Sequence, residues 1–163
     1  MRVPVSTGAG IGGPAFDLGF AAFVERNRPR YLRYAEARLS PEEAPQGVAG
    51  TTSAAAVVST TLVSARKRWG FILSQPCPAA EVWQELRIRV GREADRTTQR
   101  NPALAELYRR LPDGHADSVV LYCRLGFGID EAAELMGTEP PAVATALTVV
   151  RRALPNLMEG RRP

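Results

Sequence analysis

The residues of this sequence that are best suited to binding chemistry are arginines. Arg87, Arg89, Arg92 and Arg96 follow one another along the stretch 79–96, whose apolar residues recur at the spacing of a helix. A guanidinium group stays charged and presents a fork of N–H donors that matches a phosphate. We therefore predict that these four arginines contact a nucleic acid.

A second candidate for nucleic-acid binding is the stretch 129–154, IDEAAELMGTEPPAVATALTVVRRAL. Ala133 is small where two helices must cross closely, and Gly137 can adopt a positive φ in the turn between them. Pro140 and Pro141 fit the first turn of the second helix, where N–H groups have no intrahelical partner. The pattern favours a helix-turn-helix, and a plain helical hairpin is the alternative.

The second helix of that pair has an unusual outward face for a helix that reads DNA. Its outward residues are mostly small and uncharged: Pro141, Thr145, Thr148, Val149 and Arg152. Bases in the major groove are read mainly by Arg, Lys, Asn and Gln, while Thr can only touch a thymine methyl or make a simple hydrogen bond. Phosphate contacts would depend on Arg151, Arg152 and Arg124. We therefore expect weak DNA binding from Pro141, Thr145, Thr148, Arg151 and Arg152, with a low salt dependence.

No grouping of residues typical of an enzyme is present. The sequence has a single histidine, His115, and no Ser/His/Asp set or pair of carboxylates suggests a catalytic centre. Cys77 and Cys123 have no His or Cys partners at metal-ligand spacing and read as free thiols of a reducing cytoplasm. The motif GAGIGG near the start lacks the preceding strand that a phosphate loop needs. We expect no catalytic residue, no metal and no cofactor.

The length and charge of the chain allow one ordinary domain or two small ones. It has 163 residues, 45% of them hydrophobic, and a net charge of +4. Residues 15–100 hold thirteen basic and nine acidic residues, whereas residues 101–163 hold seven and eight. The basic excess that would suit a nucleic acid is therefore in the first part, away from the predicted helix-turn-helix. No apolar run or leader suggests a membrane span or export, so we expect a cytoplasmic protein.

Helical periodicity continues through most of the chain. Residues 17–39, about 53–69 and about 79–96 have helical spacing, and Pro29 is expected to kink or split the first of these helices. The Pro- and Gly-containing segment 40–50 is expected to be a loop. The fold predicted is all-α, with two small helical domains joined by a short linker. Its parts are a flexible tail (1–14), a helical domain (15–96), a linker (97–102) and a helix-turn-helix domain (103–163).

The phrase RLPDGHADSVVLYCRLGFGIDEAAELMG, continued to Leu154, resembles the promoter-reading C-terminal domain of bacterial sigma factors. The most similar group is the small two-domain extracytoplasmic-function (ECF) sigma factors. FAAFVERNRPRYLRYAEARL, AAAVVSTTLVSARKRW and PCPAAEVWQELRIRVGREADR resemble successive helices of that family's N-terminal domain. The resemblance covers about residues 16–155. It implies region 2-like and region 4-like domains that contact RNA polymerase core and the −10 and −35 promoter elements.

The sequence departs from that family at the helix expected to dock on polymerase. The family usually carries an acidic pair and a Gln on the outward face of this helix. Here the matching positions are Ala55, Ala56 and Ser59, followed by Thr60, and the face continues with Val63 and Lys67. The charged and amide groups that would make polar contacts at such an interface are therefore missing.

Two functions fit these observations. One is an ECF-type sigma factor, or a sigma-like transcription regulator, that binds polymerase core and promoter DNA and has an anti-sigma factor as a further partner. The alternative is a sigma mimic, a protein-interaction module that binds an anti-sigma factor or another regulator without recognising a promoter. Ala55, Ala56, Ser59, Thr60, Val63 and Lys67 are the predicted polymerase- or partner-binding residues in both.

Overall fold

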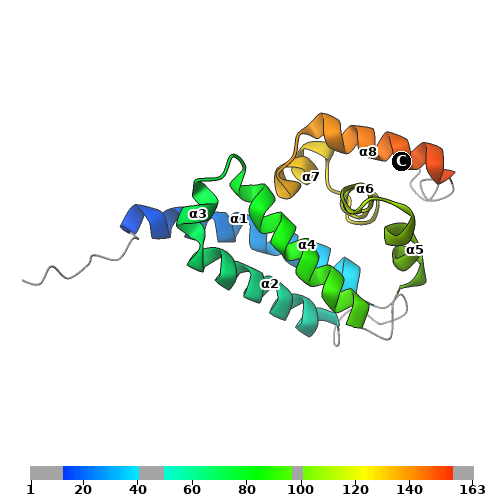
Figure 1. Cartoon of the computed structure of the whole chain (residues 1–163). Helices are drawn as coiled ribbons and strands as arrows, with labels where there is room; N and C mark the ends of the chain where they lie inside the picture. Colours follow the sequence, from blue (N-terminus) through cyan, green and yellow to red (C-terminus); the bar gives the residue numbers. More distant parts are fainter. Residues whose placement is uncertain (1–12, 41–49, 97–100, 156–163) are drawn as a thin grey trace, which may run out of the picture.

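The computed structural model of the chain describes residues 13–40, 50–96 and 101–155, and these residues are helical with no strand (Figure 1). The first half contains α1 (Pro14–Leu39), α2 (Gly50–Lys67), α3 (Trp69–Leu73) and α4 (Pro78–Arg96). The second half contains α5 (Pro102–Arg110), α6 (Asp113–Val119), the π-helical turn η1 (Val120–Arg124), α7 (Ile129–Met136) and α8 (Pro140–Ala153). The predicted all-α fold is confirmed. None of the described helices is long and apolar enough to cross a membrane.

In the first half, α1, α2 and α4 pack together through the apolar faces that the sequence indicates. Val58 and Leu62 of α2 and Val82 and Leu86 of α4 are buried. The residues of α2 that alternate with this stripe face solvent. Helical periodicity alone therefore predicts correctly which side of each helix faces the core.

Pro29 does not split the first helix, because α1 runs unbroken from Pro14 to Leu39. A proline within a helix removes one intrahelical hydrogen bond and usually bends or ends the helix. Pro29 itself is exposed, whereas Tyr31 and Tyr34, two and five residues further along the helix, are fully buried. Burial of these rings beyond the proline favours continuation of the helix.

Two other predicted boundaries are shifted. The second helix, expected to reach Trp69, ends at Lys67, and Trp69 begins the short helix α3, which the sequence did not indicate. The helix is interrupted at Arg68, whose ψ of 15° lies outside the helical range. The expected loop 40–50 lies outside the described residues except for Ser40 and for Gly50, which begins α2.

The ends of the expected tail and linker belong to helices. Residues 1–12 of the tail lie outside the described residues, and Pro14 is the first residue of α1. Residues 97–100 of the linker also lie outside them. Asn101 is buried, and its side chain accepts a hydrogen bond of 3.1 Å from the backbone N–H of Leu104, so it caps α5.

In the second half, α7 and α8 have the geometry expected from their glycine and prolines. Gly137 ends α7 in the left-handed conformation, with φ of 66°. A Cβ atom at this position would collide with the backbone of Ala80 in α4, so the turn packs directly on the first half. Pro140 and Pro141 occupy the first turn of α8, and Val143, Leu147 and Val150 are buried.

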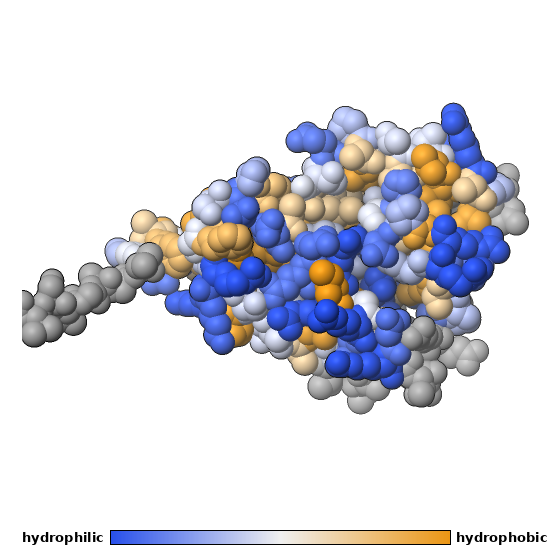
Figure 2. Space-filling view, in the orientation of Figure 1, coloured by the Kyte–Doolittle hydropathy of each residue, from blue (hydrophilic) through white to orange (hydrophobic). Residues whose placement is uncertain are grey.

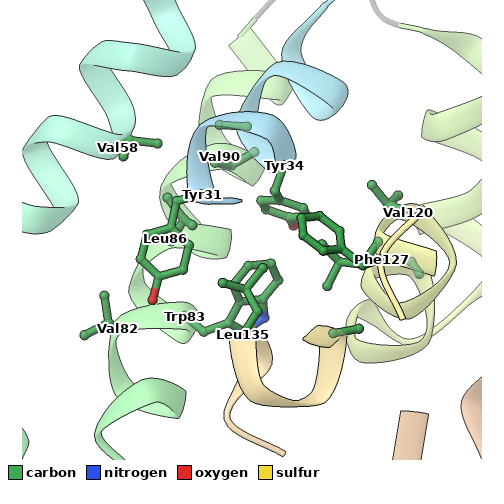
Figure 3. Packing of buried hydrophobic residues seen from close by; sticks show 14 of the residues in the cluster. Tyr31, Tyr34, Val58, Val82, Trp83, Leu86, Val90, Val120, Phe127 and Leu135 are labelled. Atoms are coloured by element: carbon green, nitrogen blue, oxygen red, sulfur yellow. The ribbon is translucent and has the colours of Figure 1, made fainter. Parts of the chain in front are cut away.

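One apolar core extends through both halves. Figure 3 shows Tyr34 of α1 and Trp83 of α4 directed toward Phe127 and Leu135 of the second half. The ring centroids of Tyr34 and Trp83 are 4.6 Å apart, and all four side chains are buried. The division into two domains stays a prediction, and the halves pack against each other in this structure.

Candidate nucleic-acid and protein interfaces

The four arginines predicted to bind a nucleic acid lie on two different faces of α4. Arg89, Arg92 and Arg96, here called the outer arginines, recur at intervals of three and four residues and therefore share one side of the helix. Arg92 and Arg96 are exposed, and Arg89 is half-buried. Arg87 points instead toward the second half of the chain, and only 21% of its side chain is exposed. The structure thus brings together three of the four.

The outer arginines form one wall of a hollow between α2 and α4. The hollow has a volume of about 270 Å³, and its lining residues are Ser53, Ala56, Val57, Thr60, Arg89, Arg92, Glu93 and Arg96. Figure 2 shows the face over α4 as predominantly hydrophilic with apolar spots. Small side chains of α2 leave the arginine wall open to solvent, so an anionic group or an acidic chain has access to it.

The outer arginines differ in how far they are neutralised within their own half. Arg89 donates to Glu85 Oε1 at 2.8 Å, and Glu85 also accepts from Arg68. Burial raises the pKa of Glu85, but hydrogen bonds from Ser64, Arg89 and Arg68 outweigh it and hold that pKa below its ordinary value. Arg92 has no carboxylate partner among the described residues, so it keeps the most available charge.

The predicted partner-binding residues of α2 all face solvent. They are Ala55, Ala56, Ser59, Thr60, Val63 and Lys67. The hydroxyl of Thr60 donates to the carbonyl of Ala56 at 2.9 Å, which leaves it no free donor. More than half of Val63 is exposed. This face therefore offers methyl groups, the Ser59 hydroxyl and one lysine to a partner, and the sequence predicts its exposure correctly.

The predicted DNA-contacting residues of α8 are also exposed. They are Pro141, Thr145, Thr148, Arg151 and Arg152. The hydroxyl of Thr148 donates to the carbonyl of Ala144 at 2.9 Å, so its exposed methyl group remains the main contact it can offer. The two arginines lie in the last turn of α8, and the first turn carries no basic residue. Figure 1 places α8 and α2 on opposite sides of the molecule, so the two predicted surfaces are separate.

A set of residues that the sequence did not indicate joins the two halves. Asp117, near the apolar run SVVLYC, is 1% exposed and meets Tyr34, Arg38, Arg87 and Tyr108. A carboxylate next to an apolar run is rarely buried without polar partners. The position of Asp117 in the sequence could therefore have indicated a buried polar contact, but it does not identify the partners. The described residues contain no group of three or more His, Cys, Asp and Glu side chains that could hold a metal ion.

No protein-family model matches this sequence, and no curated protein matches it. Among solved structures, the chain is similar to CnrH, an ECF sigma factor, in its complex with the cytosolic domain of CnrY. The TM-score is 0.50 and the sequence identity is 22%, and the match covers 90% of this chain and 91% of the other. At this identity the likeness shows the fold, which is an all-α, ECF sigma-like fold.

Proposed function

We propose that this protein is a sigma-like transcription regulator of the ECF type. It binds RNA polymerase core through the exposed face of α2 and promoter DNA through the outer arginines of α4, with weaker contacts from α8. No catalytic step and no cofactor enter this function. The protein acts in the cytoplasm, where polymerase and promoters are found.

The observation that carries this proposal is the ECF sigma-like fold combined with the neighbouring positions of two surfaces. The exposed face of α2 and the outer arginines line the same hollow. A protein partner on α2 and a nucleic acid on α4 can therefore be held side by side, as transcription initiation requires. Clustered arginines on one helix face provide the electrostatic contribution that dominates DNA affinity.

Run-off transcription with purified core polymerase tests the proposal. Core enzyme supplemented with this protein is expected to initiate on promoter fragments that core enzyme alone does not use. Gel filtration of the mixture tests core binding separately. Absence of both co-elution and initiation from a genomic fragment library would contradict the proposal.

A specific observation favours the sigma mimic as a second candidate. The exposed residues of α2 lack the acidic and amide groups of the family, and Thr60 has its donor occupied by its own helix. Coupling across charged interface pairs ranges from about 1.5 to 7 kcal/mol in favourable cases, so losing such pairs lowers affinity strongly. A smooth apolar face suits an apolar protein partner better. If the protein is a sigma mimic, a regulatory protein is the expected partner, which the complex of the similar structure CnrH with CnrY supports.

The double variant Ala55→Glu with Ala56→Asp distinguishes the two candidates. If α2 faces polymerase, restoring the acids strengthens core binding, which surface plasmon resonance against core enzyme measures. The matched control is Ala21→Glu with Ala22→Asp on the exposed side of α1, which adds the same two charges at another adjacent pair of exposed alanines. If the wild type already binds core at nanomolar concentration and the acids change nothing, polymerase binding does not depend on this altered face. If neither protein binds core, the sigma mimic is favoured.

A further inference from the structure

A second hollow lies where the last turns of α1 and α4 meet α5 (Figure 1). Its volume is about 480 Å³. Small-molecule pockets commonly measure about 300–1,000 Å³ and occur preferentially where two structural units meet. We call this hollow the junction pocket, because α1 and α4 belong to the first half of the chain and α5 belongs to the second. Its lining residues have no part in the proposed function.

The walls of the junction pocket are mostly apolar and come from all three helices. Leu39 of α1 and Leu104 of α5 are buried, and Ala94 of α4 is partly buried. Pro102 and Ala105 of α5 complete the apolar lining and are exposed. Buried side chains therefore form the floor and exposed ones the rim, as in a pocket that takes up an apolar group from solvent.

One charged group belongs to the floor of the pocket. Only 9% of the Arg38 side chain is exposed, and its guanidinium lies 3.5 Å from the centre of the Tyr108 ring, which also lines the pocket. Arg38 Nη1 donates to the Tyr34 hydroxyl at 3.1 Å and lies 3.8 Å from Asp117 Oδ1. Within the described residues, Arg38 Nε and Nη2 have no hydrogen-bond acceptor. The Nε–Nη2 edge of the guanidinium is therefore left for a ligand.

This edge of Arg38 has the geometry that recognises a carboxylate. Two parallel N–H groups on one edge of a guanidinium match the two carboxylate oxygens and bind them together. The floor is buried, and such hydrogen bonds are electrostatically stronger inside a protein than in water. Stacking on the Tyr108 ring holds the guanidinium in place before any ligand arrives, which lowers the entropic cost of binding.

The rim of the pocket restricts the charge that a ligand can carry. Asp95 and Glu106 line the pocket, and Arg109, which lines it as well, donates to Glu106 at 2.8 Å. Hydrogen bonds from Arg109 and Arg110 lower the pKa of Glu106 to about 2, so this carboxyl is ionised at neutral pH. A second anionic group of a ligand would meet rim carboxylates and a cation that is already paired. A ligand with one carboxylate and an otherwise apolar body fits better than a phosphate ester or a polyanion.

We propose that the junction pocket binds a small monocarboxylic acid with an apolar body, of the size of a medium-chain fatty acid. The carboxylate binds the Nε–Nη2 edge of Arg38, and the apolar body lies against Leu39, Leu104 and Ala105. The acid contacts helices of both halves and binds the folded protein alone, so it stabilises the fold.

This site goes beyond the proposed function and does not depend on it. Neither polymerase nor DNA enters the tests below. A protein that fails in run-off transcription can still bind the acid, and a protein that directs transcription can fail to bind it.

The first test titrates the full chain with octanoate and, separately, with octanol, which has the same chain length and no carboxylate. Two-dimensional amide NMR spectra locate the binding. Amides of the pocket, among them those of Leu39, Ala94 and Leu104, are expected to shift and to reach saturation with octanoate. A hydrogen bond to a charged group corresponds to about ten- to a hundredfold in an equilibrium, so octanol should bind weaker by about that factor. Equal affinities for octanoate and octanol would overturn the proposal.

The position of the shifts separates this site from general adsorption to apolar side chains. Phe71 and Leu73 of α3 are 57% and 50% exposed, and Figure 1 shows α3 and α5 at opposite ends of the molecule. Shifts that concentrate on α3, or that grow without saturation, would show adsorption of an apolar chain and overturn the proposal.

The second test compares Ala105→Phe with Ala103→Phe. Both alanines are exposed on α5 and both changes add the same ring, but only Ala105 lines the pocket. Ala105→Phe is expected to weaken octanoate binding roughly tenfold or more, and Ala103→Phe to leave it within about twofold. Equal affinities of the two variants would overturn the proposal.

Arg38→Gln completes the test, because it should remove the preference for octanoate over octanol. Circular dichroism checks that this variant keeps its helical signal, since Arg38 also contacts Tyr34 and Asp117. If the variant unfolds, the wild-type comparison of octanoate with octanol and the two alanine variants decide. A folded Arg38→Gln variant that still prefers octanoate would overturn the assignment of the carboxylate to Arg38.

Discussion

Two sets of arginines lie in the first half of the molecule and differ in what neutralises them. One is the outer arginines, and the other is the set that contacts the second half, here called the interface arginines: Arg26, Arg30, Arg33, Arg38 and Arg87. Arg89 and Arg96 meet carboxylates of their own helix, Glu85 and Glu93, four and three residues away. Among the interface arginines, Arg26, Arg30 and Arg33 meet groups that are 92 or more residues away along the sequence. A local charge pattern can predict the first kind of pair and carries no sign of the second. Arginine spacing alone therefore does not show which arginines are available to a ligand.

The two sets of arginines differ because one lies on an open helix surface and the other lies around the shared core. The outer arginines lie beside the small residues of α2, so solvent reaches them. The interface arginines surround aromatic side chains of the shared core, among them Tyr34 and Phe127. Guanidinium groups stack on such rings while their stems cover apolar surface. The interface arginines therefore contribute to the stability of the fold as well as to its charge.

The largest effect is expected from Trp83→Ala, which removes the ring on which both halves pack. Trp83 is 3% exposed, with its ring centre 4.6 Å from that of Tyr34. Truncating a buried Trp costs about 3–5 kcal/mol of unfolding free energy. Denaturant unfolding followed by circular dichroism measures the loss. The control Gln84→Ala, at an exposed position of the same helix, should stay within about 0.5 kcal/mol of the wild type. A loss below 1 kcal/mol for Trp83→Ala would show that the two halves do not share a core.

The sequence predicts the helices and their inward faces well, because periodicity records burial directly. Val58, Leu86, Val143 and Leu147 belong to the apolar residues that recur at helical spacing, and all four are buried in the structure. The sequence does not predict the packing of the halves, since nothing local to Tyr34 or Asp117 specifies the other. It assigns Arg87 the same role as its neighbours, although that side chain leaves α4 toward the second half. The missing information is the tertiary arrangement, which determines the partners of a charge.

A smaller loss of stability is expected from Gly137→Ala, which tests how closely the second half packs on α4. Gly137 has φ of 66°, and an added Cβ would collide with the backbone of Ala80. The left-handed conformation costs a non-glycine residue about 1–2 kcal/mol, and the collision increases the loss to about 2–3 kcal/mol. Thermal and denaturant unfolding measure it.

Gly91→Ala is the matched control for that substitution. Gly91 lies within α4, and nothing is within 4 Å of the added Cβ. Alanine within a helix is favoured over glycine by roughly 0.5–1 kcal/mol, so this variant should be more stable than the wild type. If Gly137→Ala is equally stabilising, the close approach of the turn to Ala80 does not exist in solution.

Arg92→Gln and Arg33→Gln test whether the outer and the interface arginines differ in their contribution to DNA binding. Under the proposed function, Arg92 contacts a phosphate directly, so its removal should reduce the slope of log affinity against log salt by about 1. Arg33 binds the Leu125 carbonyl and the Phe127 ring instead, so its removal should not reduce that slope. Titrations of a DNA duplex at several salt concentrations measure both slopes. Equal reductions would remove the distinction between outer and interface arginines.

The smallest effect is expected from Glu134→Gln, whose contact is largely solvated. Arg26, with Arg30, lowers the pKa of Glu134 from 4.5 to about 2 in the folded protein. A carboxyl with a lowered pKa stabilises the folded state above pH 4.5, and this contribution is lost as the pH falls through 4.5 toward 2. Because 44% of the Glu134 side chain is exposed, solvent screening limits the contribution to under about 1 kcal/mol.

Comparing that variant with Glu106→Gln isolates the part of the effect that belongs to the contact between the halves. Hydrogen bonds from Arg109 and Arg110 lower the pKa of Glu106 to about 2 as well, but all three residues lie on α5. Both wild-type pairs should therefore weaken over the same acidic range. Only Glu134→Gln should increase amide hydrogen exchange in α7 at neutral pH, because only that carboxylate connects α7 to α1. If Glu106→Gln increases exchange in α7 to the same extent, the effect reflects general loss of charge pairing, and the comparison between local and long-range pairs fails.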